Sequence, residues 1–200
     1  MDFNLDAFPV DDTKNGIRST EKIKIIICYI MSAVQTPLSR STIQSILYDN
    51  GIANYFEISQ AVDDLLAVNA LEPKKSENSD EEELYSLNEN GERIARELEN
   101  ELSVYIKNKA VKAANLTLLY EKRQRENDIS VEKLGDKRYR LNITMHSGLN
   151  SEVNNDELLK LELFVTDELR ANSMKRCFIN NPVKLYEKIT EALTEDAEFR

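Results

Sequence analysis

Residues 71–91 read LEPKKSENSDEEELYSLNENG, and this stretch decides how the first half of the chain is interpreted. Two short runs, 71–75 and 84–87, can form strands, and the polar residues 76–82 between them suit a connecting tip. Such a pair of runs around a polar tip predicts a β-hairpin. The next residues, 88–91, lead directly into another helical pattern.

Three helices are predicted before this hairpin. The first begins at Ser19 or Thr20, stops at Thr36-Pro37, and has a buried stripe formed by Ile23, Ile26, Ile27, Ile30 and Val34. The second follows the capping residue Ser39 and covers 40–48, and the third covers about 54–68. The order helix, helix, helix, hairpin, helix is typical of a winged helix-turn-helix, in which the hairpin is the wing. We therefore expect no strand within 39–68 and a two-stranded wing between 71 and 87.

A long helix is predicted from about Gly91 to Arg125. Its apolar residues lie along one rough stripe, and its small residues Ala110, Ala113 and Ala114 allow another helix to approach closely. A small winged domain cannot cover so long a stripe, so this helix must pack on a second domain, a second subunit or both. We expect a homodimer whose interface includes it. The residues expected in that interface are Leu98, Leu102, Tyr105, Ala113 and Leu116.

After Asn127 the apolar period changes from that of a helix to that of a strand. Strands are predicted around 129–134, 139–145 and 159–165, followed by helices that begin after Asp167 and at Pro182. This region is expected to be a three-stranded antiparallel sheet with two helices on one face. The predicted fold class is thus α+β, with a flexible arm (1–18), a winged helix-turn-helix domain (19–90), a long connecting helix (91–126) and an α+β domain (127–200).

Composition predicts a cytoplasmic protein with no membrane contact and no catalytic centre. The longest apolar run, 25–31, is shorter than the roughly 18–20 residues that a membrane span needs, and the acidic start of the chain shows no secretory signal. Cys28 and Cys177 lie far apart, which suits a reducing compartment. His146 is the only histidine, and no metal-ligand spacing, phosphate loop or nucleophile motif accompanies it. No enzyme activity, metal or cofactor is therefore expected.

The candidate DNA-binding residues come from the second helix, the third helix and the wing. The expected contacts are Arg40, Asn54, Tyr55, Ser59, Gln60, Lys74 and Lys75. Against them stand the net charge of −10, the acids Glu57, Asp63 and Asp64 on the third helix, and the acidic wing tip 80–83. Because few bases are present, affinity for double-stranded DNA is expected to be modest.

Three stretches resemble bacterial winged-helix regulators: 22–30 with 37–39, 54–71, and 84–94. The last of these resembles the Y-x-L-T-x-x-G wing exit of the PadR and MarR superfamilies, with Asn88 in place of the usual Thr. The whole chain is similar to an uncharacterised winged-helix family of Gram-positive bacteria, a domain of unknown function. The resemblance implies the fold and no established activity.

Two functions are compatible with these observations. The first is a dimeric DNA-binding transcriptional regulator. The alternative is an acidic protein-interaction module that keeps the winged fold without DNA contact and offers its acidic wing to a protein partner. Local charge distinguishes them, because a regulator should show a positive face formed by Lys22, Lys24, Arg40, Lys74 and Lys75.

Overall fold

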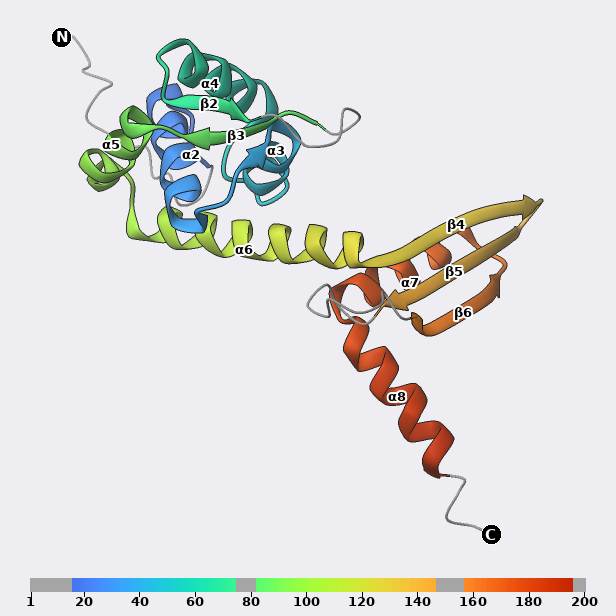
Figure 1. Ribbon diagram of the computed structural model, residues 1–200. Coiled ribbons are helices and arrows are strands. Elements are labelled where there is room, and N and C mark those ends of the chain that lie inside the picture. The colour runs from blue at the N-terminus through green and yellow to red at the C-terminus, as the bar shows by residue number, and fades with distance from the viewer. Residues whose placement is uncertain (1–15, 75–81, 147–156, 196–200) are drawn as a thin grey trace, which may run out of the picture. The chain divides into compact units, whose positions relative to one another are not determined.

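The computed structural model describes residues 16–74, 82–146 and 157–195 (Figure 1). The chain divides into two compact units, 1–118 and 119–200. Within the described residues there are seven α-helices and two three-stranded antiparallel sheets, so the predicted α+β architecture is confirmed. None of the described helices combines the length and apolar character needed to span a membrane.

The first three helices of unit 1 begin at the predicted polar residues. They are α2 (Thr20–Val34), α3 (Arg40–Tyr48) and α4 (Tyr55–Ala67). The side chains of Ser19, Ser39 and Asn54 each accept a hydrogen bond from a backbone N–H three residues later, which satisfies one free donor of each helix. The helix α2 ends one residue before the predicted stop, because Gln35 adopts a left-handed conformation.

A small antiparallel sheet follows these helices. It contains β1 (Leu38–Ser39), β2 (Leu71–Lys74) and β3 (Leu84–Leu87), in the order β1–β3–β2. The predicted strand pair is confirmed, with Leu71 opposite Leu87, whereas residues 76–81 of the predicted tip 76–82 lie outside the described residues. The expectation of no strand within 39–68 is wrong at its first residue, because Ser39 pairs with Leu84. A strand of two residues is too short to show an alternation of apolar and polar side chains, so only its hydrogen-bonded pairing with another strand defines it.

The core of unit 1 is centred on α2. Side chains from α2, α3, α4 and β1 fill it, and those of Ile26, Leu38, Leu47 and Leu65 are almost fully buried. The sheet and α5 (Glu89–Glu97) close around the same core, since α2 contacts both β3 and α5. This packing leaves the opposite side of α4 exposed.

The single long helix predicted over 91–125 is wrong. The chain forms α5, the short 3-10 helix η2 (Glu99–Glu101) and α6 (Val104–Glu126) instead. Leu102 between η2 and α6 is extended and buried in the core of unit 1, so the chain must leave the helical path there. Ser103 then starts α6, because its hydroxyl accepts a hydrogen bond from the Ile106 N–H at 3.3 Å.

Unit 2 contains the predicted antiparallel meander of β4 (Asn127–Gly135), β5 (Arg138–His146) and β6 (Glu157–Val165). The helix α7 (Glu168–Asn180) packs on this sheet and buries Phe178 and Ile179 against Leu141 and Ile143. The helix α8 (Pro182–Glu195) runs away from the sheet beyond its first turns (Figure 1). The expectation of two helices on one face is therefore correct for α7 and wrong for most of α8.

Candidate nucleic-acid interface

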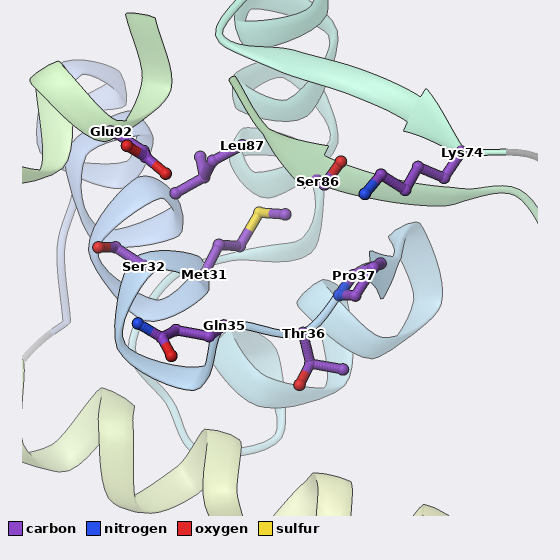
Figure 2. Close-up of a pocket in the computed structure, with 9 residues that line it drawn as sticks. All are labelled: Met31, Ser32, Gln35, Thr36, Pro37, Lys74, Ser86, Leu87 and Glu92. Carbon is purple, nitrogen blue, oxygen red and sulfur yellow. The ribbon is translucent and has the colours of Figure 1, made fainter. Parts of the chain in front are cut away.

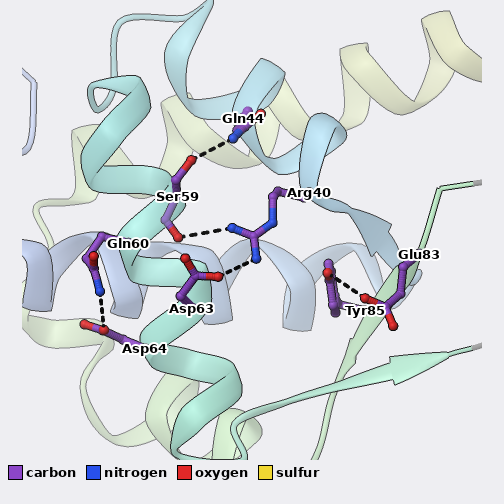
Figure 3. A network of polar contacts seen from close by, with 8 residues as sticks. All are labelled: Arg40, Gln44, Ser59, Gln60, Asp63, Asp64, Glu83 and Tyr85. Atoms are coloured by element: carbon purple, nitrogen blue, oxygen red, sulfur yellow. Dashed lines mark hydrogen bonds and ion pairs between the residues drawn. The ribbon is translucent and has the colours of Figure 1, made fainter.

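The helix α4 presents a polar face on the outside of unit 1. Ile58, Val62 and Leu65 point into the core, and their spacing places Ser59, Gln60 and Asp63 on the other side (Figure 3). Gln60 and Asp63 are exposed and Ser59 is half-buried. The amphipathic pattern of the sequence thus identified both faces of this helix.

Arg40 is held against α4 by two groups. Its Nη2 lies 2.5 Å from Asp63 Oδ1, and its Nη1 donates a hydrogen bond to the Ser59 carbonyl at 3.3 Å (Figure 3). The hydrogen bond with Asp63 is the main reason that the pKa of Arg40 is raised above its usual value. The guanidinium therefore links α3 to α4, and its charge is largely balanced within unit 1.

A second carboxylate of α4 contacts two other residues that were expected at the DNA-binding face. Asp64 accepts a hydrogen bond from Gln60 at 2.8 Å and forms an ion pair with Lys24 of α2 at 3.4 Å. The Gln60 hydrogen bond, followed by the contact with Lys24, keeps the pKa of Asp64 below its ordinary value. Because Lys24 and Arg40 each face a carboxylate of α4, these two bases do not form the locally positive surface expected of a DNA-binding face.

The structure brings Arg40, Ser59 and Gln60 together but gives Asn54 a different role. The Asn54 side chain accepts a hydrogen bond from the Glu57 N–H at 2.9 Å, so it caps α4. The Ser59 hydroxyl is engaged by Gln44 of α3 at 2.9 Å, a contact that sequence reasoning missed. Gln44 is a half-buried polar residue of a short helix, and no local pattern marks it.

Tyr55 belongs to an exposed aromatic group that the sequence analysis did not recognise. Its ring lies edge-on to Tyr48, with centroids 6.3 Å apart, and edge-on to Phe56, with centroids 5.7 Å apart. Phe56 is 81% exposed. Residues 55 and 56 are adjacent aromatic residues at the start of a helix, and only one face of the helix can be buried. They cannot both point into the core, so their sequence could have indicated this exposed group.

Lys74 lies at the end of β2 and borders a separate hollow of about 310 Å³ (Figure 2). Met31, Pro37, Ser86 and Glu92 also line this hollow, so Lys74 lies near the end of α2. Lys75 lies outside the described residues, as do Asp80 and Glu81 of the predicted acidic tip.

The two described acids of that tip, Glu82 and Glu83, make contacts within unit 1. Glu82 accepts hydrogen bonds from the Ser41 N–H at 3.0 Å and from the Ser41 hydroxyl, at the start of α3. Burial raises the pKa of Glu82, but these hydrogen bonds and the charge of Arg40 outweigh burial and lower it overall. Glu83 accepts a hydrogen bond from the Tyr85 hydroxyl at 2.9 Å. Burial and this contact raise the pKa of Tyr85.

The residues expected in a dimer interface do not share one face. Leu102 and Ala113 are buried in the core of unit 1, as are Ala110 and Ala114. Leu98, Tyr105 and Leu116 are instead exposed, by 42%, 52% and 57%. The predicted stripe assumed one continuous helix, but the helix is interrupted at Leu102, so the residues of α5 and α6 do not follow one helical period.

His146 is paired with a carboxylate from the neighbouring strand. Its Nε2 lies 2.9 Å from Asp128 Oδ2 of β4, and Glu157 is its partner on the other neighbouring strand, β6. Within that part, no three His, Cys, Asp or Glu residues are grouped so that they could hold a metal ion.

These features define a two-unit α+β protein whose first unit exposes a polar helix beside a small antiparallel sheet. The family model of a domain of unknown function, DUF4364, matches residues 23–193, and the chain belongs to this family. No curated protein and no solved structure matches the chain.

Proposed function

We propose that this protein is a dimeric, DNA-binding transcriptional regulator of the winged helix-turn-helix type. The observation that carries the proposal is the sheet order β1–β3–β2 beside an exposed α4. The strand β1 lies between α2 and α3 and holds the β2–β3 pair against the helices, as in a winged helix. In this arrangement α4 enters the major groove and the β2–β3 pair is the wing. The resemblance of residues 84–94 to the PadR and MarR wing exit supports the same assignment.

The exposed residues of α4 have distinct roles in the proposed complex. Gln60 reads a base edge, because its amide can donate and accept together, while Tyr55 and Ser59 contact the duplex beside it. Arg40 and Lys74 bind backbone phosphates and position the protein without reading sequence. To do so, Arg40 exchanges Asp63 for a phosphate. This exchange, and the acids that α4 brings to the duplex, make the affinity modest.

A second candidate is an acidic protein-interaction module with the same fold and no DNA contact. It is favoured by the pairing of Lys24 with Asp64 and of Arg40 with Asp63, which neutralises two of the bases expected on a DNA-binding face. Its partner would be a basic protein that binds the acids around the wing.

The two candidates are distinguished by genomic DNA pull-down sequencing with the purified protein, followed by affinity measurements on the selected fragments over a range of salt. We expect roughly two to four phosphate contacts per subunit, since log affinity falls with log salt by about 0.9 per contact. Replacing Asp63 with Asn should raise affinity and steepen this slope, because it frees Arg40. Glu157→Gln, which removes one exposed carboxylate from β6 in unit 2, is the matched control.

Two further variants separate phosphate contacts from base reading. Lys74→Glu together with Lys75→Glu should lower affinity for all sequences and flatten the salt slope. Gln60→Ala should reduce the preference between sequences, at a cost of about 1–3 kcal/mol on the preferred site. If the wild-type protein binds no duplex at low salt, selected fragments included, the regulator is rejected and the interaction module replaces it.

A further inference from the structure

Unit 2 contains an apolar cavity that the proposed DNA contact does not use. It has a volume of about 370 Å³ and lies between the inner face of β5 and β6, the end of α7 and the first turns of α8. Its floor is formed by two cross-strand pairs, Leu141 with Leu163 and Ile143 with Leu161. Leu161 and Leu163 stay half-exposed although they face α7, because α8 runs away from the sheet. The volume falls within the range of about 300–1,000 Å³ that is typical of small-molecule sites.

The polar groups of this cavity are nitrogen donors along one edge. Lys184 and Lys188 lie one turn apart on α8, and Asn181 precedes the helix. The Asn181 side-chain oxygen accepts a hydrogen bond from the Lys184 N–H at 3.2 Å, which leaves its NH₂ group as a donor. Neither lysine has an ion-pair partner within 16–74, 82–146 and 157–195.

The charge of this edge is opposite to that of the chain. The sequence holds 36 acidic and 26 basic residues, yet the described residues that line the cavity include two lysines and no carboxylate. A neutral apolar ligand would need no such edge, and an organic cation would be repelled by it. Apolar walls with ammonium groups on one side suit a molecule with an apolar body and an anionic end.

We propose that this cavity binds a small organic anion with an apolar body. The body lies on the leucines of β5 and β6, and the anionic group lies at Lys184 and Lys188. The proposal goes beyond DNA binding and does not depend on it, since every residue that it uses belongs to unit 2.

The chain carries its own reporter for this site. Cys177 of α7 is exposed and lines the cavity, whereas Cys28 is fully buried in unit 1, where burial raises its pKa to about 12. The thiolate is the reactive form, so a thiol reagent should modify Cys177 and leave Cys28 intact in the folded protein. Modification of Cys28 therefore signals unfolding.

The experiment measures the rate of Cys177 modification in the full-length protein by mass spectrometry, with decanoate, decanol or decyltrimethylammonium added below its micelle-forming concentration. Decanoate should slow the reaction saturably, decanol should require about a fivefold higher concentration, and the cation should be weakest. Lys184→Gln with Lys188→Gln should remove the advantage of decanoate over decanol. Lys160→Gln is the matched control, because it removes the same charge from an exposed position of β6 that does not line the cavity.

Each other outcome overturns the proposal. Absence of protection by decanoate, with Cys28 unmodified, rejects the site. Equal protection by decanoate and decanol rejects the anionic preference. Protection that rises with protein concentration in the absence of added ligand shows that a second copy of the chain fills the cavity instead. DNA affinity is measured separately, so failure of this proposal and failure of the regulator are distinguishable.

Discussion

Gly91 lies in the first turn of α5, where the helix passes the backbone of Ala70. A methyl group at this position would lie 2.3 Å from the Ala70 carbonyl oxygen and 2.6 Å from the Leu87 side chain. Asn88 stabilises the same crossing, since its side-chain oxygen accepts from the N–H groups of Asn90 and Gly91 while its amide donates to the Asn69 carbonyl. The glycine at the end of the stretch 84–91 is therefore required by close packing, and Asn88 caps the start of α5.

We expect Gly91→Ala to lower the free energy of unfolding by about 1–3 kcal/mol, because the added methyl group forces α5 away from Ala70. Urea unfolding followed by circular dichroism measures the change. Gly135→Ala is the control, since nothing lies within 4 Å of a methyl group at that position. Equal stability of the Gly91 variant and the wild-type protein would contradict the packing argument.

At the level of elements, the start of α3 is tied to the residues before β3 by Glu82. The free N–H groups of a helix start favour a negative charge, and Glu82 provides one at the Ser41 N–H. Its lowered pKa means that the folded state favours the charged form. The contribution to stability is present above the ordinary Glu value of 4.5 and is lost as the pH falls below it.

We therefore expect Glu82→Gln to reduce the loss of stability between neutral pH and about pH 4. The effect should be about 0.5 kcal/mol, because solvent screens a contact at this exposed position. Thermal unfolding at several pH values measures it, with Glu101→Gln of η2, an exposed carboxyl, as the matched control. An unchanged pH dependence in the Glu82 variant would show that the contact with Ser41 contributes nothing to folding.

For the whole molecule, the proposed function requires two subunits, and α6 offers exposed apolar residues for their association. Tyr105 and Leu116 lie eleven residues apart, close to three turns, so they share a face of this helix. Both are more than half exposed. Leu102 and Ala113, which the sequence pattern also placed in the interface, are already buried within unit 1 and cannot contribute to that face.

We expect light scattering to show a dimer at tens of micromolar, and Tyr105→Glu with Leu116→Glu to shift it towards monomer, because charges in an apolar contact are costly. Leu158→Glu, at an exposed position of β6, is the matched control. Leu102→Ala should instead lower the free energy of unfolding by about 2–5 kcal/mol without weakening association. A strictly monomeric wild-type protein would refute the dimer, and a dimer unaffected by the α6 substitutions would place the interface elsewhere.

The sequence by itself determined the elements that depend on local physics. Capping residues and the helical spacing of apolar residues defined α2, α3 and α4. The alternation of apolar and polar residues defined β5 and β6. Both kinds of pattern depend only on residues that are close together in the sequence. The paired strands β2 and β3 followed from two short runs around a polar tip. The same periodicity separated the inner and outer faces of α4, and so identified Gln60 and Ser59 as surface candidates.

Only the tertiary structure decided the features that join distant residues. The strand β1 exists through its pairing with β3, and the break at Leu102 occurs because the core of unit 1 accepts that side chain. The partners of Arg40 and Lys24 lie 23 and 40 residues away, so no local pattern could show that carboxylates of α4 balance them. Charge in a sequence can be counted, but which charges meet depends on how the helices pack.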